Sequence, residues 1–278
     1  MPAVGKNEEQ KYLQALKKLF QKLIDETRKG DGILNGDMGQ IRSFLHSEEV
    51  DAYLENAVGR MTKSIRVESA KSWREAVTQG TNSRLLYQLI QNEMKGPVGR
   101  RVWELVSENV AFIKTIPDNW KRYAEEYIYR ETLKGKRPEQ IQKELMEKLP
   151  EHCLRNLTCV ARTESAKVNA EIVQARAEMC GIHAYFWRCV SDERSRSAHR
   201  KMDGILVFYN DPPNPEALFP SKGQRAYGSY HAGNTFNCRC FQEPVVDVRF
   251  LPDIVRAHDH GEIKQMTKAQ LIRRYQVA

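Results

Sequence analysis

Apolar residues recur at three- and four-residue steps through the first two-thirds of the chain. Between residues 8 and 29, for example, Tyr12, Leu16, Leu19 and Leu23 fall on one side of a helix. The same period predicts further helices over 39–58, 63–79, 82–94, 99–114, 118–134, 138–149 and 151–180. The apolar positions do not keep a seven-residue repeat from one helix to the next, so the pattern favours an extended helical bundle over a coiled coil.

Glycine and proline mark the predicted ends of these helices. Gly30 to Gly32 stops the first helix, and Asn82 or Ser83 is expected to cap the helix that Gly96-Pro97 ends. The sequence Ile116-Pro117-Asp118 predicts a break followed by a new N-cap, Gly135 ends that helix, and Pro138 suits a first helical turn. Gly181 is expected to terminate the last long helix.

The pattern changes after Gly181, where short runs of aromatic and β-branched residues replace the helical period. We predict strands over 182–190, 205–209 and 241–248, the first two paired and the third at an edge because it contains Pro244. A helix capped by Ser191 is expected to run to Met202. The predicted fold class is α+β, in which a mainly helical N-terminal two-thirds precedes a small α+β domain with short strands and a long loop.

These elements suggest four regions along the chain. We predict a helical docking region over 1–115, a helical support over 116–180, a small α+β head with a polar loop over 181–248, and a C-terminal tail with a short helix over 249–278.

Composition narrows the classes of protein that the chain could be. Its 278 residues suffice for a packed core, and no apolar run is long enough for a membrane span or a secretion signal. We therefore expect action in the cytoplasm, or wherever a cytoplasmic assembly carries the protein. The net charge of +8 is spread thinly. It is compatible with nucleic-acid contact and equally with ordinary solvated helix faces.

The stretch from Trp187 to Cys240 lacks the apolar periodicity that would order it. Its two ends carry metal-ligand residue types: His199, His231, Cys238 and Cys240. Two imidazoles and two thiolates suit zinc, which would also order the loop. Cys-x-Cys is less typical of zinc sites than Cys-x-x-Cys, however. The two thiols could instead face the core, and His199 could donate to a backbone carbonyl, whereas a disulfide in so small a ring is disfavoured.

The remaining cysteines give no secreted framework. Cys153, Cys159 and Cys180 fall in a helical pattern, and we expect them to be small reduced side chains that are buried or half-buried.

Charged residues surround the same loop. We group seven polar residues as a candidate structural network: Arg162, Glu164, Asp192, Arg194, Arg196, Asp203 and Asn237. Such a cluster could hold a phosphate or a metal-bound water, with His199 as general base. We favour ion pairs that lock the loop, because arginines two residues apart on a helix point to different sides.

A further set of basic residues is a candidate DNA contact: Arg200, Lys201, Lys222, Arg225 and Arg239. Tyr227 and Tyr230 lie between these positions. They could stack on bases or fill the small core of the loop.

Several motifs in this order resemble one known family. A-R-T-E at 161–164, G-I-x-x-Y-x-W at 181–187, D-E-R-S-R-S-A-H-R-K-M-D-G at 192–204 and N-C-R-C at 237–240 together resemble the phage Mu F-like head morphogenesis family of minor capsid proteins. The resemblance covers roughly residues 120 to 245. It implies a minor head protein of a tailed phage or prophage, present in few copies and associated with the portal or procapsid, and in some relatives leaving the capsid with the DNA.

Two functional hypotheses follow from these observations. The resemblance implies an assembly protein whose partners are the portal protein, the major capsid or scaffolding protein and packaged double-stranded DNA, with no membrane. Its expected place is the inside of the virion head, and the host cytoplasm during assembly. The alternative is a metal-dependent hydrolase, nuclease or toxin-like domain carried by a phage particle.

Overall fold

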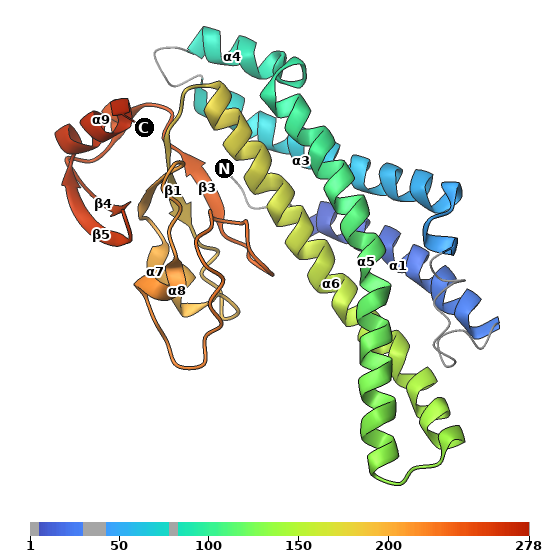
Figure 1. Cartoon of the computed structure of the whole chain (residues 1–278). Helices are drawn as coiled ribbons and strands as arrows, with labels where there is room; N and C mark the ends of the chain where they lie inside the picture. The colour runs from blue at the N-terminus through green and yellow to red at the C-terminus, as the bar shows by residue number, and fades with distance from the viewer. Residues whose placement is uncertain (1–5, 30–42, 78–82, 278) are drawn as a thin grey trace. The chain divides into compact units, whose positions relative to one another are not determined.

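The computed structural model describes residues 6–29, 43–77 and 83–277 (Figure 1). Its helical part comprises α1 (Lys6–Lys29), α3 (Glu48–Val77), α4 (Ser83–Gln91), the 3-10 turn η1 (Glu93–Lys95), α5 (Pro97–Leu133) and α6 (Pro138–Met179). The part that follows comprises β1 (Ala184–Arg188), α7 (Ser197–Met202), β2 (Leu206–Phe208), α8 (Pro215–Leu218), β3 (Phe241–Pro244), η2 (Val248–Phe250), β4 (Ile254–Asp259), β5 (Glu262–Thr267) and α9 (Lys268–Val277). This arrangement confirms the predicted α+β class.

The described chain divides into two compact units that are not contiguous in sequence. One unit contains Thr62–Trp103 and Arg162–Ala278, and the other contains Asn7–Met61 and Glu104–Ala161. Helices α3, α5 and α6 therefore contribute residues to both units. The four consecutive regions suggested by the sequence stay a prediction.

Helical packing around large apolar side chains makes the core of the second unit. Phe20 of α1 meets Trp120 of α5 edge to face, with ring centroids 4.9 Å apart, and both side chains are almost fully buried. The Tyr12 hydroxyl donates to Oδ1 of the buried Asn109 at 3.3 Å. The apolar stripe predicted for the first helix therefore faces a core, as its helical period indicates.

Three predicted helix breaks are absent. Residues 58–63 lie inside α3, residues 149–151 lie inside α6, and α5 continues through Pro117. A proline inside a helix removes one backbone hydrogen bond and crowds the preceding turn. At Pro117 the flanking Ile113, Ile116 and Trp120 are all buried, so side-chain packing outweighs the local cost. The predicted stop at Gly30 to Gly32, the start at Gly39 and the cap at Asn82 lie outside the described residues, as does the Ser83 side chain.

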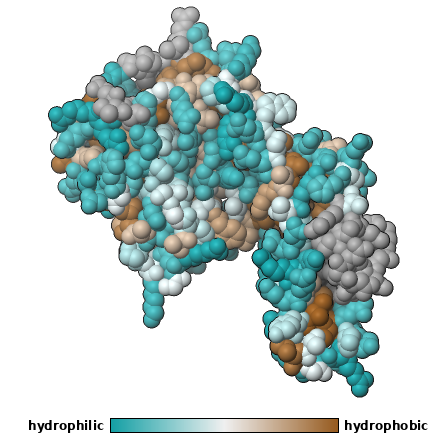
Figure 2. All heavy atoms as spheres, in the orientation of Figure 1, coloured by the Kyte–Doolittle hydropathy of each residue, from teal (hydrophilic) through white to brown (hydrophobic). Residues whose placement is uncertain are grey.

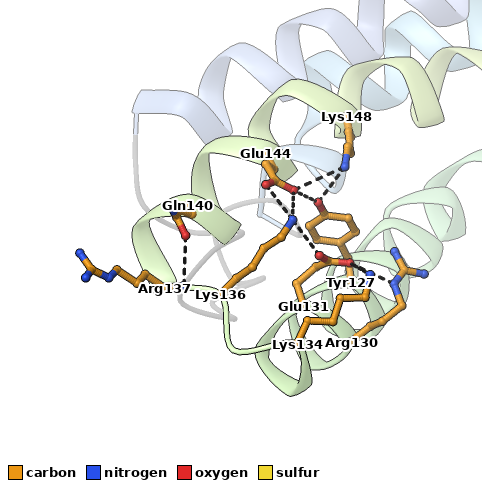
Figure 3. Close-up of polar contacts among 9 residues, drawn as sticks. All are labelled: Tyr127, Arg130, Glu131, Lys134, Lys136, Arg137, Gln140, Glu144 and Lys148. Atoms are coloured by element: carbon orange, nitrogen blue, oxygen red, sulfur yellow. Dashed lines mark hydrogen bonds and ion pairs between the residues drawn. The ribbon is translucent and has the colours of Figure 1, made fainter.

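Charged side chains fix the turn between α5 and α6 (Figure 3). Lys136 in the turn forms ion pairs with Glu131 of α5 and Glu144 of α6, each at 2.8 Å. The Tyr127 hydroxyl donates to Glu144 at 2.5 Å and accepts from Lys148 at 2.8 Å. Hydrogen bonds from Lys134 and Lys136 lower the pKa of Glu131 to about 2, and bonds from Lys136 and Tyr127 lower that of Glu144 to about 2. Lys136 is thus the central cation of a network of ion pairs that holds the turn.

A buried arginine ties together the helices of the first unit. Arg176 of α6 is completely buried and makes a bidentate contact with Glu93 of η1, from Nε at 2.7 Å and Nη2 at 3.1 Å. Its Nη1 donates to Ser69 of α3 at 2.8 Å, and its guanidinium lies 5.8 Å from the ring centroid of Trp73. Arg66 gives Glu93 a second cation at 2.7 Å. Arg176 therefore neutralises the buried charge of Glu93 and links α6 to both η1 and α3.

Gly181 ends α6 as predicted and directs the chain into the sheet. Its φ of +64° is left-handed, where glycine has no steric penalty. The Ile182 amide donates to the Ala177 carbonyl at 2.8 Å, and the Gly181 amide donates to Glu178 at 3.1 Å. This pair of bonds is a Schellman cap, which satisfies the carbonyls left free at the helix end.

The sheet has the strand order β3-β1-β2-β4-β5, with β2 and β4 parallel and all other pairs antiparallel. The predicted pairing of the first two strands and the edge position of the strand containing Pro244 are confirmed. Alternate residues face two different cores. Tyr185, Trp187 and Val207 pack with the loop, and Leu206 and Phe208 pack with the C-terminal segment.

Two strands of this sheet were not predicted. β4 and β5 form a hairpin whose turn residues, His260 and Gly261, both have positive φ, which is typical of a tight two-residue hairpin turn. The helix predicted near the C-terminus is present as α9. Thr267 and Gln270 form a reciprocal capping box at its start, with the Gln270 amide bonded to Thr267 Oγ1 at 3.3 Å.

The helix predicted from Ser191 to Met202 begins later than expected. Ser191 has a φ of +55°, and α7 starts only at Ser197. Asp192 Oδ1 instead accepts the amide of Arg194 at 3.1 Å and the hydroxyl of Ser195 at 3.0 Å. Short polar side chains often turn the backbone in this way and compete with helix formation.

The buried Arg176–Glu93 pair gives a stability prediction. Replacing Arg176 with Met leaves Glu93 buried with Arg66 as its remaining cation, so we expect a loss of about 3–5 kcal/mol in the free energy of unfolding. Urea unfolding of the full chain measures this loss. Lys71→Met is the matched control, since Lys71 pairs with Glu68 where both side chains are about 60% exposed, and such pairs contribute at most about 1 kcal/mol. Equal stability of the two variants would contradict the role assigned to Arg176.

A buried cysteine and histidine cluster at the closure of the loop

The two ends of the long loop meet at three buried side chains. His199 Nδ1, from α7, lies 3.5 Å from Cys238 Sγ and 3.4 Å from Cys240 Sγ. The potential ligand atoms of these three residues all lie within 4.8 Å of one another. Only 3% of His199, 2% of Cys238 and 7% of Cys240 is exposed. We call these three residues the Cys-His cluster.

Cys189, directly after β1, adds a third sulfur beside the cluster. A hydrogen bond from Cys240 lowers the pKa of the Cys189 thiol to about 5, and the same interaction raises the pKa of Cys240. The bond from Cys240 also lowers the pKa of Cys238. In these contacts Cys240 is the donor, and Cys189 and Cys238 are the acceptors.

The far side of the His199 ring is held by a tyrosine and a carboxylate. The Tyr230 hydroxyl donates to Glu216 at 2.7 Å and 2.9 Å and lies 2.8 Å from His199 Nε2. Since the only hydroxyl proton of Tyr230 goes to Glu216, Nε2 must carry a proton and donate. Nδ1 is then the ring atom that faces the two sulfurs. Glu216 lies on α8, which begins at Asn214, whose side chain accepts the Ala217 amide at 3.1 Å.

An ion pair joins the same two segments at the surface. Both guanidinium Nη atoms of Arg239 contact the carboxylate of Asp192, and this contact lowers the pKa of Asp192 to about 2. Asp203 Oδ1 accepts the Cys189 amide at 2.8 Å and so fixes the end of β1. The structure gives no side-chain contact for Arg194, which is exposed. Asp192 and Asp203 thus have structural partners.

The returning part of the loop is attached to α6. Arg162 Nη1 donates to Asn237 Oδ1 at 3.2 Å, and the Asn237 amide donates to Thr163 Oγ1 at 2.9 Å. Asn234 donates to Glu171 at 2.6 Å. Gly233 has a φ of +88°, and a Cβ there would lie 3.0 Å from the Cys240 carbonyl and 3.2 Å from Ala170 Cβ, so the backbone can approach the helix only without a side chain. Glu164 is buried on the same helix.

The basic residues proposed for DNA contact fall in different settings. Arg239 is paired with Asp192, whereas Lys222, Arg225 and Arg200 are exposed. Lys201 lies over the ring of Phe219, with its Nζ 5.7 Å from the centroid. These observations give no gathered basic face, and DNA contact stays a prediction.

The two tyrosines of the loop have separate surroundings. Tyr230 is 8% exposed and belongs to the core beneath the loop, so it is not free to stack on bases. Tyr227 lies between two guanidinium groups, 4.6 Å from that of Arg196 and 5.5 Å from that of Arg225. Arg196 also donates to the Phe236 carbonyl at 2.7 Å, so this stack fastens the loop to the start of α7.

His231, expected as a fourth metal ligand, is not part of the Cys-His cluster. Its Nδ1 lies 3.2 Å from the Tyr185 hydroxyl, and its ring packs edge to face on Tyr185. Tyr185 accepts the Ala232 amide at 3.2 Å. Burial lowers the pKa of His231 to about 4. The structure therefore places a neutral histidine in the core next to the cluster.

Sequence reasoning missed Cys189, Glu216 and Tyr230 as partners in this site. The alternation of side chains along β1 could have identified Cys189, because this residue lies on the same side of the strand as Tyr185 and Trp187. No spacing rule pointed to Glu216 or Tyr230. They meet His199 only because α8 and the loop fold back over α7.

A small hollow opens beside the cluster. Its volume is about 60 Å³, and its lining includes His199, Cys238 and Cys240. Small-molecule sites usually measure about 300–1,000 Å³, so this space suits an ion or one or two water molecules rather than an organic substrate.

The cysteines on α6 differ from those at the cluster. All six cysteines are free, Cys153 is buried, and Cys159 and Cys180 are half-buried, as the helical pattern predicted. Burial raises the pKa of Cys153 to about 12 and that of Cys180 to about 11. Among the cysteines whose pKa is shifted, Cys189 and Cys238 at the loop closure are the two whose pKa is lowered.

The fold and the site define a class of protein with long helices and a small α+β domain. Contacts between side chains hold the long loop of that domain in place. Residues 124–243 match the family model described as Phage Mu protein F like protein, which confirms the resemblance seen in the motifs. A Haemophilus influenzae protein described only as uncharacterized is 29% identical over 150 residues, which are 54% of this chain and 30% of that relative. No solved structure gave a significant match.

The buried His231 gives a pH prediction. The pKa of the folded state, about 4, lies below the ordinary value of 6.5, so the unfolded chain binds a proton that the folded chain excludes as the pH falls through this range. We expect stability to fall between about pH 6.5 and pH 4, by about 3 kcal/mol from this group.

Nuclear magnetic resonance of the imidazole of His231 tests this directly. The ring should stay neutral at pH 5 in the folded chain and titrate near 6.5 in urea. A ring that is already charged at pH 5.5 in the folded chain would show that His231 is not enclosed as described.

Proposed function

We propose that this protein is a phage head morphogenesis protein, a minor component that associates with the portal or procapsid. The match of residues 124–243 to the Mu F-like family supports this proposal most strongly. The closed loop agrees with it, since the cluster borders too little space for an organic substrate. Within the described chain, no helix has both the length and the apolar character needed to cross a bilayer.

The helices offer the surface for such an association. Figure 2 shows a face that is mostly hydrophilic, with hydrophobic atoms in small separate patches. Trp103 on α5 is 71% exposed, which is unusual for so large an apolar side chain. Tryptophan is enriched among the residues that carry most of the energy of protein interfaces. In this proposal Trp103, within the docking region predicted over residues 1–115, contacts the portal or shell, and DNA is a neighbour rather than a recognised ligand.

Particle assembly tests the proposal. The full chain is expressed with the head genes of a phage or prophage that encodes it, and procapsids are separated on a density gradient and quantified by mass spectrometry. We expect the chain in the procapsid fraction in far fewer copies than the major capsid protein. Its absence from every particle fraction would reject the assembly role.

Within that assay we expect Trp103→Ala to lower incorporation by about tenfold or more, the effect of losing one interface residue worth at least about 1.4 kcal/mol. Phe250→Ala is the matched control, because Phe250 is similarly exposed at 74% but lies outside the docking region. Circular dichroism checks that both variants fold. If the control loses as much as Trp103→Ala, the docking surface is elsewhere.

A further inference from the structure

We propose that His199, Cys238, Cys240 and Cys189 bind one zinc ion, which closes the loop between β2 and β3. The inference concerns the isolated chain and does not depend on the proposed function. It replaces the histidine expected from the sequence, His231, with a third cysteine.

The spacing of the cluster atoms fits a tetrahedral ion. Zn–S bonds of about 2.3 Å and Zn–N bonds of about 2.0–2.1 Å at tetrahedral angles place nitrogen and sulfur about 3.6 Å apart. His199 Nδ1 lies 3.5 Å from one sulfur and 3.4 Å from the other. Both sulfurs converge on one ring nitrogen, and an ion between them would satisfy all three atoms.

The hydrogen bonds of His199 orient its ring for coordination. Tyr230 and Glu216 keep the proton on Nε2, which leaves Nδ1 directed at the sulfurs. Metal-bound histidines usually donate their other ring proton to a carboxylate, carbonyl or water. Here the carboxylate acts through the tyrosine hydroxyl, and the three groups are buried together.

Two of the sulfurs accept a backbone amide, a contact that favours the thiolate form of a cysteine. The Cys240 amide donates to Cys238 Sγ at 3.4 Å, and the Ser191 amide donates to Cys189 Sγ at 3.3 Å. In both turns the donor lies two residues after the sulfur. The positive-φ residues stand at different places in the two turns, since Asn237 at +52° precedes Cys238 and Ser191 at +55° follows Cys189 by two residues. Cys189 packs against the same buried core as Cys238 and Cys240, just outside the group of three whose ligand atoms all lie within 4.8 Å of one another, so it is the sulfur placed to take the fourth position.

The donor set selects the ion. On binding zinc, the thiols release their remaining protons to solvent. The resulting three thiolates and one imidazole are soft ligands that suit zinc and disfavour magnesium or calcium. Four protein ligands with burial around them are typical of structural zinc sites, whereas catalytic sites keep an open position. The hollow of about 60 Å³ at the cluster has room for the ion.

Metal content is the first measurement. The full chain, purified under reducing conditions and dialysed against a weak chelator, should retain about one zinc per chain by elemental analysis. A preparation with no stoichiometric zinc that also fails to bind added zinc would overturn the proposal.

Cobalt substitution then counts the ligands. Wild type loaded with Co²⁺ should show the absorption of a tetrahedral site with three thiolates. In Cys189→Ser the intensity of the sulfur-to-cobalt charge-transfer band should fall by about one third, the contribution of one thiolate. The variant should bind zinc at least about tenfold more weakly, because losing even a residue that hydrogen-bonds to a metal ligand lowers metal affinity by about tenfold or more. An unchanged cobalt spectrum in Cys189→Ser would remove Cys189 from the site.

Two variants serve as controls. Cys180→Ser removes another free, half-buried cysteine, and His231→Gln removes the histidine that lies outside the cluster. Both should keep the wild-type cobalt spectrum. Loss of the metal spectrum in folded His231→Gln, with Cys189→Ser unaffected, would favour the ligand set expected from the sequence over the one proposed here.

Alkylation of the wild-type chain covers the case in which Cys189→Ser does not fold. Zinc should protect Cys189, Cys238 and Cys240 from iodoacetamide in the native chain, as peptide mass spectrometry would show, while the labelling of Cys180 stays the same. Protection of Cys238 and Cys240 without Cys189 would reject the fourth ligand. A disulfide between any two of the three cysteines in the reduced preparation would reject the site.

Discussion

The contact of the His199 imidazole with the sulfurs of Cys238 and Cys240 is the interaction on which the loop depends. Between β2 and β3 the chain has only α8 as regular structure, so few backbone bonds order it. Ordering each residue costs about 1–2 kcal/mol in backbone entropy alone. Contacts at the two ends reduce that cost, because they shorten the free segment and place Tyr230 under the loop, where it adds apolar burial.

The loop is anchored to two supports within one unit. On the sheet side, Asp203 holds the Cys189 amide and the cluster joins α7 to the start of β3. On the helix side, Asn237 and Gly233 meet α6. These anchors use different chemistry, namely sulfur and imidazole in the core and amide hydrogen bonds on the helix. Loss of one kind would therefore leave the other in place, so the loop need not wait for a partner to become ordered.

Helix period and strand alternation allowed the α+β class and the first three strands to be predicted, because both patterns report local burial. The break expected at Pro117 failed because Ile116 and Trp120 are buried on both sides of it. β4 and β5 were missed, although Gly261 marks their turn and Val255 and Ala257 alternate. The candidate site was predicted from residue types, which identified three cluster members but could not show which histidine faces the sulfurs.

His231 and Cys189 illustrate that limit. A histidine near two cysteines in sequence matches a zinc pattern, yet the ring of this one contacts the Tyr185 hydroxyl, and burial lowers its pKa. Cys189 is far from the Cys-x-Cys motif in sequence, but it leaves β1 on the side that faces the motif. The β1–β3 pairing brings that strand end to Phe241, directly after Cys240. Strand register therefore brings Cys189 toward the motif, a placement that residue types along the sequence do not show.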